Sequence, residues 1–292
     1  MTLRTEMTAH LRSRARALGL VRPRRSHVAA ARMLAERRAL AWSPRRPVRR
    51  NRILCYHAVG TSAWGVNDLS PTRFRRQLEL AASAGYRFVP ADQLAGGLLQ
   101  PAPPGRPGHR DGFDPPAAEP LLAVTFDDAV GSVATNAAPI LRELDVPWTL
   151  FVVGEWADGR HAMAPGTVLG WDGISELAEA GAVIGSHSLT HRDFATLSPE
   201  ETRLELTQSR QLIRDRTGIE VTDFAIPFGQ SANWSDAATA AAHEAGYRWI
   251  FAQSERRRPA GTVARTFVTR FDDDRTFTAL LDGAFDRWEE WV

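Results

Sequence analysis

The chain has 292 residues, of which 43% are hydrophobic and 24% charged, and these proportions exclude a disordered or collagen-like protein. The net charge of +2 conceals an asymmetry: residues 1–50 hold 14 Arg and two acidic residues, whereas residues 51–292 hold 22 Arg and 32 acidic residues. A single cysteine, Cys55, excludes an internal disulfide and a multi-cysteine metal site. We therefore expect a basic extension over 1–50 and an acidic domain over 51–292.

The Arg-rich extension, residues 1–50, lacks the apolar core and cleavage site of a secretory signal. No stretch of the chain approaches the ~20 apolar residues of a transmembrane helix. These features favour a cytoplasmic protein. The extension is interpreted as a disordered tail or as an amphipathic helix over 28–41, which would place its arginines against anionic membrane lipid. Nucleic acid is not an expected partner, because the rest of the chain is acidic.

Beyond the extension, short apolar strands alternate with amphipathic helices. The predicted strands are 53–57, 87–89, 121–125, 148–153, 183–185, 224–226 and 247–251. The predicted helices are 71–84, 91–99, 133–144, 172–180 with Asp172 as its cap, 199–216, 235–245 and 276–291. Seven Pro and three Gly in residues 101–120 predict an exposed loop. The repeated order predicts a parallel sheet or barrel, with functional residues at the carboxyl ends of the strands.

Two adjacent acidic residues, Asp127 and Asp128, come where the apolar run 121–126 ends. Neighbouring carboxylates in a dry site repel each other, so both stay ionised only if a cation or hydrogen-bond donors compensate. A metal ion on one carboxylate would leave the other free to act as a base. The alternative is that Asp128 caps the helix that follows.

A pair of histidines, His187 and His191, also follows an apolar strand. A spacing of four residues can place both imidazoles on one side of a helical turn. Two histidines and one carboxylate form a metal-binding set that leaves coordination positions open for water and substrate. Nitrogen and oxygen donors of this kind suit Zn²⁺ or a similar divalent ion.

Two weaker features lie at the same predicted edge of the sheet. Pro227 and Phe228 belong to a turn after the strand 224–226, and such a turn can present backbone N–H groups to an oxyanion. His57 ends the first strand. A lone histidine is more often structural, but this one is expected near the other features.

Together these segments resemble the NodB-homology polysaccharide deacetylases, carbohydrate esterase family 4, over about residues 53–282. Thr-Phe-Asp-Asp at 125–128 is similar to the first motif of that family, and His-Ser-Leu-Thr-His at 187–191 is similar to the second. Residues 224–229 resemble a variant third motif. The resemblance implies a distorted (β/α) barrel of about seven parallel strands. It also implies a metal-dependent deacetylase that hydrolyses the N-acetyl amide of an N-acetylated sugar and releases acetate.

The resemblance assigns roles to the motif residues. Asp128, His187 and His191 would hold the metal, with Zn²⁺ favoured over Co²⁺, Ni²⁺ and Mn²⁺. Asp127 would be the general base that activates the hydrolytic water. The main-chain N–H of Phe228, beside Pro227, would bind the oxyanion and the substrate.

Three departures from the family pattern stand out. The late Leu-x-His motif, which supplies the general acid in many members, is absent. In this respect the sequence resembles the poly-N-acetylglucosamine deacetylases, in which the histidine of an early Tyr-His segment is the acid. The resemblance therefore points to His57 as the general acid. The Arg that opens the third motif is replaced by Ala225, and Arg265 or Arg270 could substitute for it. The usual glycine after the acidic pair is Ala129.

Two other functions are compatible with the same residues. One is hydrolysis of a different C–N bond, such as that of a cyclic imide or ureide. The other is carbohydrate binding without turnover. Retention of Asp127 argues against the second, because a purely structural metal site does not need a second carboxylate.

Overall fold

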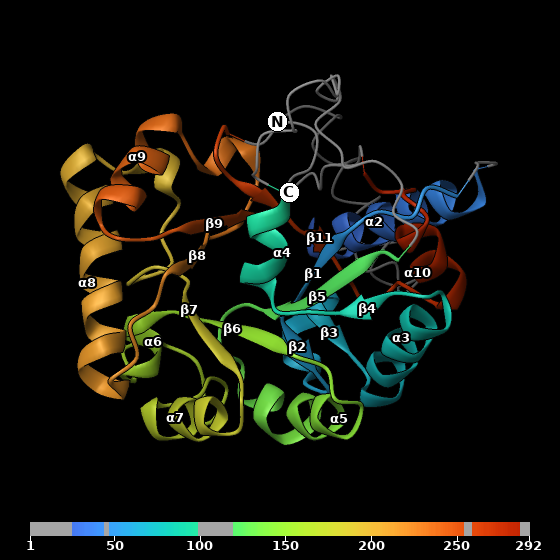
Figure 1. Ribbon diagram of the computed structural model, residues 1–292, viewed down its shortest axis with the longest axis horizontal. Coiled ribbons are helices and arrows are strands. Elements are labelled where there is room, and N and C mark those ends of the chain that lie inside the picture. Colours follow the sequence, from blue (N-terminus) through green and yellow to red (C-terminus); the bar gives the residue numbers. More distant parts are fainter. Residues whose placement is uncertain (1–24, 44–46, 99–118, 254–258, 287–292) are drawn as a thin grey trace, which may run out of the picture.

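The computed structural model describes residues 25–43, 47–98, 119–253 and 259–286. Within these ranges nine strands form one sheet in which every pairing is parallel (Figure 1). The strands are β1 (Arg52–Tyr56), β4 (Arg87–Phe88), β5 (Leu121–Phe126), β6 (Trp148–Val152), β7 (Val183–Ser186), β8 (Asp223–Ala225), β9 (Trp249–Ala252), β10 (Val263–Ala264) and β11 (Thr266–Phe267). A separate two-stranded ladder pairs β2 (Ala58–Val59) with β3 (Asp68–Leu69).

The sheet curves into a barrel whose two edges are joined by a single residue. Its order is β10-β9-β8-β7-β6-β5-β1-β11, with β4 added at the start of β5. The two edge strands, β10 and β11, are separated in the chain only by Arg265. The predicted distorted (β/α) barrel is therefore confirmed, with eight strands along this path.

Helices cover the outside of the barrel, and one helix closes an end (Figure 1). The outer helices include α3 (Pro71–Ser83), α5 (Ala138–Glu143), α7 (Trp171–Glu179), α8 (Pro199–Thr217), α9 (Asp236–Glu244) and α10 (Asp274–Leu281). Helix α4 (Ala91–Leu98) packs its apolar face on Ile53, Ala123 and other residues of the barrel interior. Its Gly96 lies against Trp249 at the start of β9, so α4 covers the end where the strands begin. Polar residues lie at the opposite end of the barrel, where the strands finish.

Tight packing in the barrel interior requires a glycine at position 185 of β7. The ring of Phe151 fills the space beside Gly185, where a Cβ atom would lie 2.6 Å from the ring carbons. Only glycine avoids this clash, so Gly185 lets β7 pass the ring just before the His187 segment begins.

Some predicted element boundaries were wrong. The last helix does not run over 276–291: α10 ends at Leu281, and Gly283 follows with a left-handed φ of 88°, which ends the helical path. Asp172 lies inside α7, and Gly170 is its N-cap. Residues 101–118 of the predicted loop and residues 1–24 of the extension lie outside the described residues. None of the helices in the described ranges has both the length and the apolar character needed to span a bilayer.

Part of the basic extension forms a helix that packs on the barrel. Helix α2 (Arg25–Trp42) includes the predicted segment 28–41 and contacts α10. Its Arg37 is fully buried and pairs with Asp272 at 2.5 Å, while Nη2 of Arg37 donates to the carbonyl oxygen of Phe267 at 3.0 Å. Phe267 belongs to β11, so the extension contacts the strand that closes the barrel.

Candidate active site

The predicted site residues meet at the end of the barrel opposite α4. Asp127 and Asp128 directly follow β5, His187 follows β7 and His57 follows β1. Parallel strands deliver their following residues to one rim, which explains why segments far apart in the sequence converge. All four side chains are buried, and His191, in the turn after His187, is largely buried.

Asp128, His187 and His191 place three ligand atoms around one point. Oδ1 of Asp128 lies 3.6 Å from Nε2 of His187 and 3.5 Å from Nε2 of His191. These separations exceed those of good hydrogen bonds, and within the described part of the chain Oδ1 of Asp128 has no hydrogen-bond partner. Tetrahedral ligands at ~2.0–2.2 Å from a Zn²⁺ ion are about 3.4 Å apart. The three side chains therefore fit a divalent ion.

Neighbouring groups orient the two imidazoles toward that point. Nδ1 of His187 lies 2.9 Å from the carbonyl oxygen of Ala225, so Nδ1 carries the proton and Nε2 is left as a lone-pair donor. Burial lowers the pKa of His187 to about 3, which keeps the ring neutral, as a metal ligand must be. The ring of His191 stacks on Trp156 with centroids 5.1 Å apart. Nothing in the sequence distinguished Trp156, because its role depends on packing.

The two adjacent carboxylates have different partners. Burial, and then the charge of Asp127, raise the pKa of Asp128 well above its usual range. Among the described residues no Arg pairs with Asp128, so a cation bound between Asp128 and the histidines would favour its ionised form. Asp127 instead has a cation within the chain. This is the compensation that the adjacent pair was predicted to need.

That cation is Arg265, the residue between β10 and β11. Its Nη1 and Nη2 atoms donate to Oδ1 and Oδ2 of Asp127 at 2.6 and 2.8 Å, and both side chains are buried. Burial is the largest single influence and raises the pKa of Asp127, but the charge and hydrogen bonds of Arg265, together with His187 and His57, outweigh it, and the net shift is strongly downward. Of the two arginines considered as substitutes for the Arg missing at Ala225, Arg265 is the one that contacts Asp127. Arg270 is exposed.

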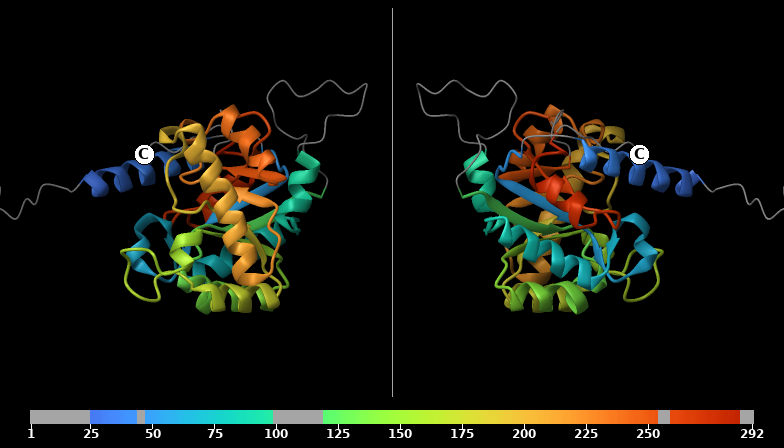
Figure 2. Two further views of the ribbon diagram at one scale, coloured as in Figure 1. Left: turned by 90° about the vertical axis from the view of Figure 1, so that its left-hand side faces the viewer. Right: turned by 90° about the vertical axis from the view of Figure 1, so that its right-hand side faces the viewer.

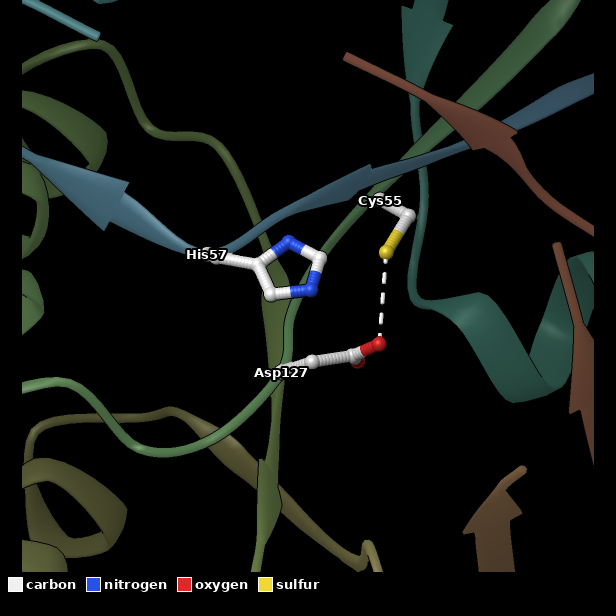
Figure 3. Close-up of side chains that lie close together, drawn as sticks. All are labelled: Cys55, His57 and Asp127. Atoms are coloured by element: carbon white, nitrogen blue, oxygen red, sulfur yellow. Dashed lines mark hydrogen bonds between the residues drawn. The ribbon is translucent and has the colours of Figure 1, made fainter. Parts of the chain in front are cut away.

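His57 faces Asp127 from the neighbouring strand, together with Cys55 (Figure 3). The ligand atoms of these three residues lie within 4.8 Å of one another, and Nε2 of His57 is 4.0 Å from Oδ2 of Asp128. Burial lowers the pKa of His57 to about 4, so its ring is neutral.

The cluster of Cys55, His57 and Asp127 is better explained by hydrogen bonding than by metal binding. Sγ of Cys55 lies 3.3 Å from Oδ2 of Asp127, and burial raises the pKa of the thiol, which therefore remains a donor (Figure 3). Arg265 already engages both oxygens of Asp127. A second ion beside this guanidinium would be repelled, so of the two clusters the one formed by Asp128, His187 and His191 is the better candidate ion site.

The turn after β8 presents a backbone amide at the same rim. Phe228 and Gly229 have left-handed φ values of 62° and 69°, and a Cβ atom on Gly229 would lie 2.6 Å from Cγ of Gln253. Left-handed backbone at Phe228 is costly and is typical of functional turns. Its half-exposed ring lies 4.8 Å from that of His191, and no residue in the described ranges accepts a hydrogen bond from its N–H. The preceding Pro227 is buried.

Comparisons with known proteins agree with the fold and the motifs. The family described as polysaccharide deacetylase matches residues 114–250. YxkH of Bacillus subtilis, which is named as a polysaccharide deacetylase, is 22% identical over 198 residues; the match covers 67% of this chain and 62% of that protein. The chain thus spans less than two thirds of this relative.

Two solved structures share the fold. IcaB from Ammonifex degensii has a TM-score of 0.61 at 23% identity, covering 81% of this chain and 97% of its own. The Streptococcus pyogenes deacetylase PplD, solved in complex with acetate, has a TM-score of 0.59 at 20% identity, covering 77% of this chain and 94% of its own. The predicted resemblance to the polysaccharide deacetylases is confirmed by the family match over residues 114–250 and by the similarity to YxkH.

Proposed function

We propose that this protein hydrolyses the N-acetyl amide of an N-acetylated sugar or polysaccharide and releases acetate. The observation that carries the proposal is the buried Asp127–Asp128 pair, in which one carboxylate is held by Arg265 and the other faces two histidines. The family match supports deacetylation. The acetate bound to PplD and the similarity to IcaB are consistent with it.

Asp128, His187 and His191 would hold a divalent ion, for which their nitrogen and oxygen donors favour Zn²⁺, with Co²⁺, Ni²⁺ and Mn²⁺ as alternatives. When bound, such an ion polarises a carbonyl group and lowers the pKa of water from 15.7 toward ~7. The charge of the ion also lets Asp128 remain ionised next to Asp127.

Asp127 is proposed as the general base. Its lowered pKa keeps it ionised, and Arg265 fixes both of its oxygens, so its orientation is set before substrate binds. It takes the proton of the attacking water. The ring nitrogen of His57 and the carboxylate oxygen of Asp127 lie within 4.8 Å of each other. A neutral His57 can therefore accept this proton and deliver it to the departing amine nitrogen. One amide and one water are consumed, and acetate and an amine are formed.

The turn at Pro227 and Phe228 is proposed to bind the reacting amide. The N–H of Phe228 is available to the oxyanion that forms when water adds to the carbonyl carbon. The exposed Phe228 ring and the Trp156 ring flank His191, and both offer apolar faces for the acetyl group and the sugar ring.

Acetate release from N-acetylated chito-oligosaccharides tests this function. The purified protein should release acetate, lose activity after chelation and regain it with Zn²⁺ or Co²⁺. The variant Asp127→Asn should bind the ion and lack activity, whereas Asp215→Asn, which changes an exposed carboxylate on α8, should behave as wild type. Turnover of a cyclic imide or ureide without acetate release would indicate the other C–N hydrolase. Ion and sugar binding without turnover of either would indicate a binding protein.

We further propose that α2 contacts an anionic membrane surface. Figure 2 shows α2 extending beyond the barrel. Its exposed face carries Val28 and Trp42, which are 55% and 66% exposed, together with Arg32 and Arg38. Apolar and arginine side chains on one exposed helix face are typical of interfacial helices. The cytoplasmic location expected from the sequence remains a prediction.

Vesicle co-sedimentation tests the membrane contact. The protein should bind phosphatidylserine-containing vesicles more tightly than pure phosphatidylcholine vesicles, and Trp42→Ser should weaken that binding several-fold. Leu204→Ser removes an exposed side chain from α8 on another face and should have no effect. Equal binding to both vesicle types, or no effect of Trp42→Ser, would contradict the proposal.

A further inference from the structure

The segment that carries both histidines has an unusual backbone. Ser188 and His191 have left-handed φ values of 73° and 60°, although neither is glycine. Each such residue costs about 1–2 kcal/mol relative to a right-handed conformation. The turn persists only if surrounding groups hold it, and the direction of the His191 ring depends on that hold.

Glu205, a buried residue of α8, holds this turn. Its Oε2 accepts hydrogen bonds from the backbone N–H groups of Leu189 at 3.0 Å and Thr190 at 2.9 Å. Its Oε1 accepts a hydrogen bond from the hydroxyl of Thr190. The side chain is only 2% exposed, so these bonds form away from water. Both oxygens therefore serve the segment between the two histidines.

The charge of Glu205 is not matched by a cation in the part of the chain that the structure describes. None of the ion pairs in the described ranges includes it, whereas the exposed Glu201, four residues earlier on α8, pairs with Arg192. Burying an unpaired carboxylate is costly unless hydrogen bonds and a nearby positive charge compensate. The positive charge at hand is the ion that His191 would bind.

We propose that Glu205 is a positioning residue of the ion site, which fixes His191 through the 189–190 backbone and adds negative charge behind it. This inference rests on the ion site of the proposed function. Groups that orient metal ligands in this way typically change metal affinity 10–100-fold when they are removed. A purely structural anchor for the turn would change stability and leave the affinity of the folded protein unaltered.

Co²⁺ binding to the chelator-treated protein, followed by calorimetry and by the visible spectrum of the ion, distinguishes these cases. Glu205→Gln keeps the shape and removes the charge and one acceptor. We expect Co²⁺ affinity to fall about 10–100-fold and the spectrum to change. The control is Glu200→Gln, which removes an exposed charge from the first turn of the same helix and should leave both unchanged. Wild-type affinity and spectrum in folded Glu205→Gln would overturn the proposal.

If Glu205→Gln does not fold, Thr190→Val serves as the second variant, because it removes one hydrogen bond and leaves the charge in place. Its Co²⁺ affinity should fall several-fold, and unchanged affinity would overturn the proposal. The wild-type titration separates this result from failure of the proposed function. If wild type binds no Co²⁺, the ion site itself is wrong; if it binds Co²⁺ and releases acetate, only the role of Glu205 is at issue.

Discussion

Arg265, the single residue between β10 and β11, donates two hydrogen bonds to Asp127, one to each carboxylate oxygen. The same residue links the two edge strands of the sheet, and its backbone N–H donates to the carbonyl oxygen of Ala252 at the end of β9. Closure of the sheet and orientation of the proposed base are therefore linked at a single position.

Arg265→Met is expected to destabilise the fold strongly at neutral pH. Removing one partner of a buried ion pair leaves an uncompensated charge and costs about 3–5 kcal/mol. The pKa of Asp127 is lowered in the folded protein, so the pair contributes stability above the unfolded pKa of ~3.9, and this contribution is lost as the pH falls. Urea unfolding of wild type and variant should therefore give a large difference at pH 7 and a smaller one near pH 3.

The matched control for this pair is Asp127→Asn/Arg265→Met, which removes both charges. It should recover part of the stability lost in Arg265→Met. A difference between wild type and Arg265→Met that does not vary with pH would show that the charge of Asp127 is not what Arg265 stabilises.

His57→Ala should separate ion binding from turnover. The ring lies close to Asp127, and its Nε2 is 4.0 Å from Asp128, outside the set of three ion ligands. We expect Co²⁺ affinity close to that of wild type and a kcat reduced by ~10²–10⁴-fold, the usual contribution of a general acid. A variant that no longer binds Co²⁺ would make His57 a ligand instead.

The predicted site residues that the structure brings together share one property: they lie in contiguous motifs at strand ends. Asp128, His187 and His191 converge because parallel strands finish at one rim, and this could be inferred from the strand pattern. Arg265 was one of two arginines that the sequence offered for the missing motif residue, and nothing in the sequence pointed to Glu205. Arg265 lies between two strands of two residues each, too short to show a period, and Glu205 is one of several acids on a helix. Their roles depend on contacts between distant segments.

The same limit applies to the Arg-rich extension. Composition suggested that residues 1–50 stand apart from the domain, yet Arg37 is buried against Asp272. The burial of Arg37 could not be recognised from charge alone, because the stretch holds 14 arginines and the pattern of α2 has few apolar residues to mark its packed face.

Truncation of the extension should therefore have two distinct outcomes. Removing residues 1–24 leaves α2 in place and should leave thermal stability and acetate release unchanged. Removing residues 1–43, or the single change Arg37→Met, deprives Asp272 of its partner and should destabilise the fold. For Arg37→Met, which leaves Asp272 buried, the cost should be about 3–5 kcal/mol in chemical denaturation. Arg38→Met, an exposed neighbour on the same helix, is the control. Equal stability of the two truncations would show that the ion pair contributes nothing to the fold.

Asp223, at the start of β8, should make stability depend on pH in the direction opposite to Asp127. Burial, and then the charge of Asp92, raise its pKa to about 7. A carboxyl whose folded pKa lies above its unfolded value stabilises the fold while it is protonated, and this stability is lost as the pH rises from ~4 through 7. One pKa unit corresponds to ~1.4 kcal/mol, so the loss is on the order of 4 kcal/mol.

The variant Asp223→Asn removes this titration. Urea midpoints at pH 4.5, 6 and 8 should show the variant gaining on wild type as the pH increases, whereas Asp215→Asn, which alters an exposed carboxylate, should follow wild type. Parallel pH curves for Asp223→Asn and wild type would mean that Asp223 is already ionised in the folded protein at pH 4.5.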